Sequence, residues 1–247
     1  MWQNSMPVRV DVEFAAKDAP KAVKRGDLII TVDVLRCSSS IVNALANGVK
    51  AVIPTETLKE AYKLREQHPD YLLAGERKGR KPKGCDLGNS PLEFVRDVVG
   101  GKTVIMTTTS GTAALVRCRR AKHVLLGAFL NAAAVVSKAM EIVQKKRVNV
   151  SFVLAGEKGL FSLEDFLCAG AIASKLSSGR LELSDKTLAA VFAFERVKDA
   201  LCEYVMESRH AKHLVELGFE RDVVFSCGLD RFGIVPFYQR GKVTLMQ

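Results

Sequence analysis

Residues 29–48 read IITVDVLRCSSSIVNALANG, which is an apolar run, a polar turn and then small and apolar residues at helical spacing. This order is typical of one strand–turn–helix unit. The same plan recurs in TVIMTTTSGTAALVRC (103–118) and in VSFVLAGEKGLFSLEDFLCAGAIAS (150–174). Short apolar runs that alternate with longer amphipathic stretches predict an α/β fold with mostly parallel sheets and helices on the faces.

The apolar runs expected to form strands are Val8–Phe14, Leu28–Val34, Ala51–Pro54, Tyr71–Ala74, Thr103–Thr107, His123–Leu126 and Asn149–Ala155. The stretches expected to form helices are Ser39–Ala46, Thr57–Gln67, Gly111–Arg120, Asn131–Lys145 and Leu163–Ser177. From Asp185 a long helix is expected to reach about Glu207. Short strands are then expected around Val223 and at Ile234–Tyr238.

An internal duplication of βα units would explain the similarity of the three segments. The alternative is that βα units generally resemble one another. No Pro/Gly/Ser-rich linker divides the chain, so we interpret residues 1–247 as a single domain. Should it consist of two subdomains, we expect the break in the loop from Gly75 to Pro91 or after Gly179.

The composition is that of a folded protein, with 48% hydrophobic and 26% charged residues. The chain has no run of about 18 apolar residues and no basic flank before an apolar stretch near residue 1. We therefore expect a cytoplasmic protein without membrane contacts. The six cysteines form no CxxC pair and have no histidine at zinc spacing, which argues against a metal cage or a disulfide framework.

The net charge of +10 favours an anionic partner, either a nucleic acid or a small acid with several charges. Basic residues cluster at positions 76–83 and 117–122, without the interleaved aromatic residues of a platform that stacks single-stranded bases. We expect a small anionic phosphorylated substrate and no nucleic acid. Whether the chain forms a homo-oligomer is left open.

The first polar turn places Asp33, Arg36, Ser38 and Ser39 between an apolar strand and a helix start. Backbone N–H groups at a helix N-terminus bind phosphate or sulfonate, and Arg36 can grip either group with two hydrogen bonds. Asp33 could hold Mg²⁺ or serve as base or nucleophile. In the alternative structural interpretation the serines cap the helix and Asp33 pairs with Arg36.

The second turn also follows an apolar strand, and its hydroxyls and glycine predict another cradle for phosphate oxygens. Its candidate substrate-binding residues are Thr108, Thr109, Ser110, Gly111 and Thr112. It is not a P-loop, because the lysine and the GKS or GKT ending are missing. Threonine runs also simply favour strands, which is the alternative.

A long loop with several glycines, residues 75–91, follows the expected strand Tyr71–Ala74. Loops of this length in compact domains are usually functional or disordered. Arg77, Lys78 and Lys83 could form a positive rim for an acidic substrate, and Glu76 is available to a metal. The alternative is a mobile surface loop.

Glu164 and Asp165 precede a further helix. In a parallel sheet the ligand lies beyond the carboxyl ends of the strands, where these acids would join Asp33 and Glu76 as oxygen ligands of Mg²⁺. A purely structural role is the competitor, because Ser162 and Asp165 have the spacing of a capping box.

Other catalytic groups find little support. None of the four histidines lies at these turns, so we expect His210 and His213 to be solvated, although one of them could reach the site as an acid. No GxSxG occurs, and Cys37 lacks the arginine six residues on that a cysteine-based tyrosine phosphatase needs, since that position is Asn43.

Several motifs, in order, resemble those of the 2-phosphosulfolactate phosphatase (ComB-like) family. They are DVLRCSSS, AGERKGRKPKGCDLGNSP, TTTSGT, LLGAFLNAAAV, AGEKGLFSLEDFLCAGAI, HAKHLVELGFERDVVFSC and IVPFY. The resemblance runs from about Val8 to Tyr238. Ser110 stands where the family pattern has Asn, and Cys37 where it usually has Ala, which puts fine substrate preference in doubt more than the chemistry.

The resemblance implies a family-specific, ComB-like α/β fold and an Mg²⁺-dependent hydrolysis of 2-phosphosulfolactate to 3-sulfolactate and phosphate, on the route to coenzyme M. It also implies where the motif residues fall. Asp33 and Arg36 take the DxLR positions, and Glu76 and Arg77 take the GER positions. The other motif positions are Asn89 and Ser90 in NSP, then Asn131, Glu164 and Asp165.

Two other functions stay open on the sequence. One is phosphatase chemistry on another phosphorylated 2-hydroxy acid, such as phospholactate or phosphoglycolate. The other is a non-catalytic module that binds anions or nucleic acid, which predicts affinity that falls steeply with salt and no phosphate release. The carboxylates among the anion cradles argue against the binding module, because acids repel a polyanion.

Overall fold

The computed structural model describes residues 7–176 and 181–246. Its strands are β1 (Val8–Glu13), β2 (Leu28–Val32), β3 (Ala51–Thr55), β4 (Leu72–Gly75), β5 (Thr103–Thr107), β6 (Val124–Gly127), β7 (Val150–Leu154), β8 (Leu181–Leu183), β9 (Pro236–Gln239) and β10 (Lys242–Leu245). They form one ten-stranded sheet, in the order β4-β5-β3-β10-β9-β6-β2-β7-β1-β8. The expected α/β class with a mostly parallel sheet is confirmed.

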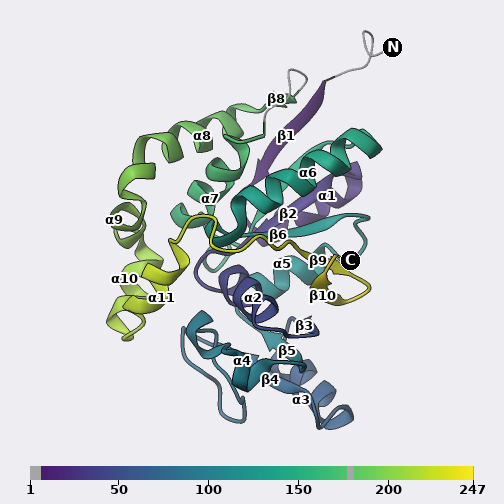
Figure 1. Ribbon diagram of the computed structural model, residues 1–247, viewed down its shortest axis with the longest axis vertical. Coiled ribbons are helices and arrows are strands. Elements are labelled where there is room, and N and C mark those ends of the chain that lie inside the picture. The colour runs from purple at the N-terminus through teal and green to yellow at the C-terminus, as the bar shows by residue number, and fades with distance from the viewer. Residues whose placement is uncertain (1–6, 177–180, 247) are drawn as a thin grey trace.

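The α-helices are α1 (Ala19–Arg25), α2 (Cys37–Ala46), α3 (Leu58–Gln67), α4 (Arg96–Val99), α5 (Gly111–Arg117), α6 (Ala132–Lys146), α7 (Leu163–Ala173), α8 (Asp185–Val197), α9 (Leu201–Met206), α10 (Arg209–Glu216) and α11 (Glu220–Ser226). Short 3-10 helices lie at η1 (Ala16–Asp18), η2 (Pro91–Glu93), η3 (Phe129–Asn131) and η4 (Lys198–Ala200). Helices α8 to α11 follow one another along one flank, while α3 and α4 lie beside β4 and β5 at one end (Figure 1).

The sheet consists of two parallel blocks joined by the C-terminal hairpin. β4, β5 and β3 form one block, and β6, β2, β7, β1 and β8 form the other. β10 pairs antiparallel with β3, β9 pairs antiparallel with β6, and β9 and β10 pair antiparallel with each other. Three successive reversals mean that the two blocks run in opposite senses.

Around the hairpin the order of strands is symmetric, with β3, β5 and β4 on one side and β6, β2 and β7 on the other. An internal duplication would produce this symmetry, and the duplication itself stays a prediction. The expected break at residues 75–91 also stays a prediction, but β4 and β5, on either side of that loop, pair directly. The break after Gly179 and the helix end at Ser177 lie outside the described residues.

Helices cover both faces of the sheet, as the alternation of side chains in β2 shows. Leu28, Ile30 and Val32 pack with side chains of α6 and α7, whereas Ile29 packs with α1, α2 and α5. Successive residues of a strand point to opposite faces, so a buried strand needs apolar residues at every position. β2 is accordingly buried throughout.

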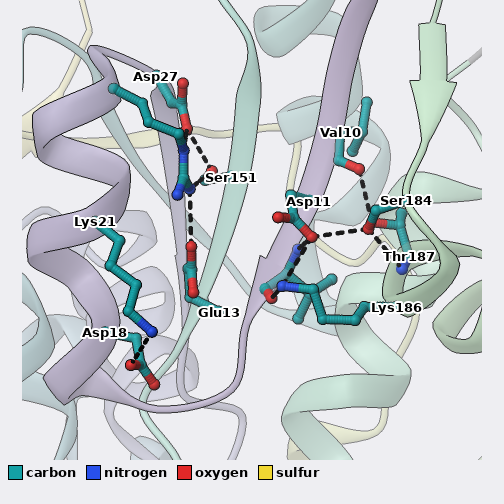
Figure 2. A network of polar contacts seen from close by, with 12 residues as sticks. Val10, Asp11, Glu13, Asp18, Lys21, Asp27, Ser151, Ser184, Lys186 and Thr187 are labelled. Carbon is teal, nitrogen blue, oxygen red and sulfur yellow. Dashed lines mark hydrogen bonds and ion pairs between the residues drawn. The ribbon is translucent and has the colours of Figure 1, made fainter.

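A polar network ties α1 to the sheet. Glu13, Asp27 and Ser151 gather between α1 and the strands (Figure 2), and Arg25 binds all three at 2.8–2.9 Å. Burial disfavours the charge on Arg25, but its hydrogen bonds to Asp27 and Glu13 outweigh burial and raise the pKa of Arg25. The network fixes α1 against β1, β2 and β7.

Two expectations for the C-terminal part are wrong. Val223 lies in α11, not in a strand, because residues 208–226 form two short helices, each with its own N-cap residue. The long helix expected from Asp185 to Glu207 breaks at η4 into α8 and α9. No helix among the described residues is long and apolar enough to cross a membrane.

Candidate active site

One cavity of about 250 Å³ collects the polar turns of both blocks. Asp33 follows β2, Glu76 follows β4, Thr108 follows β5 and Gly156 follows β7, and all four line it. The expected meeting of these turns is therefore confirmed. The reason differs from the expected one, since the strands belong to two blocks that run in opposite senses.

Asp33 lines this cavity, and only 9% of it is exposed. Its Oδ1 accepts a hydrogen bond from the backbone N–H of Cys37 at 3.1 Å. Its Oδ2 accepts none from the residues that the structure describes. Burial, together with the negative charges of Glu76 and Glu164, raises the pKa of Asp33 to about 6, against the lowering effects of His210 and the Cys37 N–H.

The N-terminal turns of α2 and α5 meet at Asp33. A Cβ atom on Gly111 would clash with Asp33 Oδ2 and Cys37 Cβ, so only glycine allows this approach. Burial and the charge of Asp33 raise the pKa of the Cys37 thiol well above its ordinary value. A thiol in this state is a poor nucleophile, in agreement with the absence of a cysteine-phosphatase pattern.

The Glu76 carboxylate organises the loop after β4. Its Oε1 accepts the N–H of Thr109 at 2.7 Å, and its Oε2 accepts the N–H of Gly79 at 2.9 Å. Both oxygens thus bind backbone groups of the cavity wall, while the residue lines the cavity itself. Glu76 links the turns after β4 and β5.

Asp165 has a similar place in the other block. Its Oδ1 accepts the N–H of Val34 at 2.8 Å and its Oδ2 that of Gly156 at 3.2 Å, which joins the turns after β2 and β7. Burial and the charges of Asp33 and Glu164 raise its pKa well above the ordinary value. The predicted cap is real as well, because the Asp165 N–H donates to Ser162 Oγ.

Glu164 does not line the cavity. It contacts His210, which we expected to be solvated. His210 Nδ1 lies 3.1 Å from Glu164 Oε1, and His210 lines the cavity. Burial disfavours the charge on His210, but the hydrogen bond that its ring donates to Glu164 and the negative charges of Glu164 and Asp33 outweigh burial and raise the pKa of His210. The expectation that His210 is a solvated surface residue is therefore wrong.

Arg36 forms a buried ion pair, but not with Asp33. Its Nη1 donates to Asp222 Oδ2 at 2.7 Å and its Nη2 to the carbonyl of Gly79 at 2.7 Å, while the guanidinium lies 4.2 Å from the Phe219 ring centroid. Asp222 Oδ1 accepts from Ser90 Oγ at 2.6 Å. The Nε–H of Arg36 is buried without a partner in the described residues, and Arg36 lines the cavity.

The hydroxyls of the first turn serve the backbone. Ser38 Oγ accepts the N–H of Asp33, and Ser39 Oγ donates to the carbonyl of Val34. Neither serine lines the cavity. The serines thus have a structural role, but neither caps α2, whose N-cap residue Arg36 makes no side-chain cap hydrogen bond; they hold the turn that carries Asp33.

In the second turn, Thr108 and Thr112 bond to each other's backbone and hold the start of α5. Thr108, Thr109 and Ser110 line the cavity. Gly111 and Thr112 do not line it, and Thr112 is fully buried. The turn therefore presents its first three residues to a ligand.

Three further predicted residues have different places. Arg77 lines the cavity, but its guanidinium binds the carbonyls of Glu76 and Thr107 and the Thr107 hydroxyl. Asn89 lines it with a buried Oδ1 that has no partner in the described residues. Asn131 is fully buried away from it, with its amide bound to the backbone of Ala128, Leu126 and Ile234, so it supports η3 instead.

The donor atoms at the cavity suit a hard cation without forming a preassembled cage. Among residues 7–176 and 181–246, no three His, Cys, Asp or Glu side chains group as metal ligands. Mg²⁺ commonly binds through one or two carboxylates, waters and substrate phosphate oxygens. Asp33 Oδ2, the Asp165 carboxylate and the unpartnered Asn89 Oδ1 are oxygen donors of that kind, whereas Glu164 is engaged by His210.

Sequence reasoning missed Asp222, and it expected His210 to be solvated, with an acid at the site only as the alternative. Both residues come from the C-terminal helices. They lie 177 and 189 positions after Asp33, and no local pattern links them to its turn. The available signals were the histidines themselves and the resemblance of HAKHLVELGFERDVVFSC to known sequences.

Comparisons with known proteins point to one family. Residues 14–241 match the family described as 2-phosphosulpholactate phosphatase. A probable 2-phosphosulfolactate phosphatase of Thermotoga petrophila is 43% identical over 218 residues, which is 88% of this chain and 92% of that protein. A protein of the same description from Clostridium acetobutylicum is 37% identical over 239 residues, 96% of this chain and 100% of its own length.

Proposed function

This chain belongs to the 2-phosphosulpholactate phosphatase family, a family of phosphoric monoester hydrolases, and from that premise we propose that it releases phosphate from 2-phosphosulfolactate. The observation that carries the proposal is the cavity lined by Asp33, Arg36 and His210, whose Nδ1 contacts Glu164. The products are 3-sulfolactate and inorganic phosphate. A place on the route to coenzyme M stays a prediction from the resemblance.

The phosphoryl group is proposed to bind beside Asp33. The N–H of Arg36 Nε and the residues Thr108, Thr109 and Ser110 offer donors to its oxygens. Donors held in place before the reaction stabilise charge that develops in the transition state, because they need not reorient. Asp222 and Gly79 hold the Arg36 guanidinium in this position.

Asp33 has two compatible roles. Its carboxylate can attack phosphorus and form a phospho-aspartate, or it can accept a proton from an attacking water. A pKa of about 6 leaves Asp33 mostly ionised at neutral pH in either case. Rapid acid quench with a substrate labelled in its phosphate tests the two roles. Label trapped on Asp33 would support the phospho-aspartate, and no label on Asp33 during turnover would support the role as a base.

His210 is proposed to donate a proton to the oxygen of the leaving 2-hydroxyl group. Because Nδ1 faces Glu164, Nε2 is the nitrogen left for the cavity. The raised pKa keeps the ring protonated to higher pH than an ordinary histidine. Glu164 thus has the positioning role of a carboxylate behind a catalytic histidine, not that of a metal ligand.

We also propose that Mg²⁺ takes part, held by Asp33 and Asp165 with oxygen ligands from the substrate. The bound cation would offset negative charge on the phosphoryl oxygens. The raised pKa values of these two carboxyl groups support this, since crowded buried acids are more stable beside a cation. Asn89 would add an amide oxygen near the same place.

The direct test is phosphate release from 2-phosphosulfolactate, measured with Mg²⁺ and with EDTA. We expect turnover with Mg²⁺, its loss with EDTA and its return when excess Mg²⁺ is added. Turnover that EDTA leaves unchanged would contradict the proposed metal. Turnover confined to phospholactate or phosphoglycolate would move the function to a phosphatase of another phosphorylated 2-hydroxy acid.

Replacing His210 with glutamine should lower kcat by about 10²-fold, the loss typical of removing a general acid. The wild-type kcat/KM should fall at low pH as Asp33 gains its proton, and fall at high pH as His210 loses its own. The alkaline limb should be absent from His210→Gln, which no purely structural role would produce. Replacing His123, which has no contact with the cavity, serves as the control.

A further inference from the structure

Two hairpins of matching sequence and geometry flank the cavity. AGERKGR (74–80) follows β4, and AGEKGL (155–160) follows β7. Arg77 and Arg80 exchange two backbone hydrogen bonds of 2.9 and 3.2 Å, and Glu157 and Leu160 exchange two of 3.1 and 2.9 Å. Each pair encloses Lys-Gly as a two-residue turn.

The lysines occupy equivalent positions in these turns. Lys78 and Lys158 have φ of 53° and 52°, and the glycines after them have φ of 78° and 80°. Two successive positive φ values are the mark of a type I′ turn, which favours Asn, Asp or Gly at its first central position. Lysine is unfavourable in this left-handed conformation. The turn itself therefore does not explain why lysine stands at both positions.

Both lysines line the cavity, and their ammonium groups are available. Within residues 7–176 and 181–246, Lys78 has no ion pair, and Lys158 has only its neighbour Glu157 at 3.9 Å. Glu157 is bound more closely by Arg209, at 2.6 Å. Arg36 and Glu76 bind Gly79 in the first turn, and Arg209 and Asp165 bind Glu157 and Gly156 beside the second. Both turns are thus anchored, while the lysine side chains stay free for a ligand.

The two turns also take equivalent places in the sheet. β4 and β7 are both the third strand from the C-terminal hairpin, on opposite sides of it. The lysines therefore approach one cavity from the two opposed blocks. Two cations that enter from opposite sides suit a ligand with an acidic group at each end.

We propose that Lys78 and Lys158 bind the acidic groups of the substrate that do not react, its carboxylate and its sulfonate. This inference rests on the proposed function, because it assigns a recognition site for that substrate. The carboxylates of Asp33, Glu76 and Asp165 would repel a substrate with several negative charges. The two ammonium groups offset that repulsion and select ligands with an acid on both sides of the reacting phosphate.

Lys78→Asn and Lys158→Asn test the proposal, because asparagine suits the turn and removes only the charge. Each variant should raise KM for 2-phosphosulfolactate about 10- to 100-fold, the loss expected for one hydrogen bond to a charged group, with kcat changed less than about threefold. For phospholactate, which lacks the sulfonate, one of the two variants should change KM less than about threefold. Lys→Arg at either position should keep most of the affinity.

Arg80→Gln is the matched control, because Arg80 is an exposed cation of the same hairpin that does not line the cavity. An equal rise in KM for Arg80→Gln would show that the loss of any positive charge in this hairpin raises KM, and it would overturn the proposal. A rise below about twofold in both lysine variants would overturn it too.

Calorimetric titration with 3-sulfolactate separates this inference from the proposed function, since binding needs no turnover. Wild-type binding that the double variant Lys78→Asn/Lys158→Asn loses would support the site even if phosphate release were absent. Binding of equal strength in both proteins, or no binding to the wild type, would overturn it. Normal turnover with either result would leave the proposed function standing.

Discussion

Replacing Asp33 with asparagine is expected to lower kcat/KM for 2-phosphosulfolactate at least about 10³-fold, or ~4 kcal/mol of transition-state stabilisation. The side chain lines the cavity, and its Oδ2 accepts no hydrogen bond from residues 7–176 and 181–246. The substitution therefore removes the proposed nucleophile or base and one proposed oxygen ligand of Mg²⁺. Steady-state phosphate release measures the effect. Retention of more than about a tenth of wild-type kcat/KM would rule out this role.

The same substitution should raise thermal stability in metal-free buffer above pH 7. The pKa of Asp33 is about 6 in the folded protein, against an ordinary value of 3.8. The folded state therefore binds this proton more tightly, so its stability falls as the pH rises between these values and stays reduced above them. Asparagine carries no charge and removes this cost, so Tm should rise.

Asp199→Asn provides the control for both measurements, because Asp199 is exposed and lies in η4, away from the cavity. It should leave kcat/KM and Tm unchanged. A large fall in Tm for Asp33→Asn would show that lost activity reflects a damaged fold. A rise in Tm together with lost activity would show that Asp33→Asn impairs the reaction and not the fold.

Replacing Asp222 with alanine is expected to lower the free energy of unfolding by about 3–5 kcal/mol, because it leaves the buried guanidinium of Arg36 without its counterion. Arg36 and Asp222 have side-chain exposures of 2% and 3%, and Ser90 would lose its acceptor as well. Urea denaturation followed by circular dichroism measures the change. Activity should also fall, since Arg36 lines the cavity.

Glu220→Ala is the matched control, an exposed acid in the first turn of the same helix, α11. Its effect should stay within about 0.3–1 kcal/mol, as expected for a charge near a helix end. The double variant Arg36→Met/Asp222→Leu should regain part of the lost stability, because it removes both buried charges together. An Asp222→Ala protein as stable as Glu220→Ala would contradict the buried pair.

Much of the fold could be predicted because its signals are local. The apolar runs of β2 and β5 are buried at nearly every position, and buried parallel strands read as continuous apolar stretches. α1 was missed although Pro20 lies near its start and Gly26 ends it with a φ of 75°. That pairing of proline and glycine is a recognised helix signal, but the segment is short and weakly periodic.

The predicted site residues that lie next to a strand end come together at one cavity, and their roles stay predictions. Asp33, Glu76 and Asp165 each line the cavity, and each is fixed by bonds to the backbone of a neighbouring turn. Asn131 carries the same polar chemistry but points into the protein, where the carbonyl of Ile234 takes its amide. The direction of a side chain after a turn depends on partners that a single segment does not contain.

The sequence by itself determined the α/β class, the strand-ending turns and the presence of carboxylates beside hydroxyl-rich helix starts, since these follow from hydrophobic period and local turn chemistry. Only the tertiary structure decided that two blocks of opposite sense place these turns around one cavity. It also brought His210 to Glu164 and Asp222 to Arg36. Such pairs form between segments far apart in the chain, and their geometry depends on how the whole sheet and its helices pack.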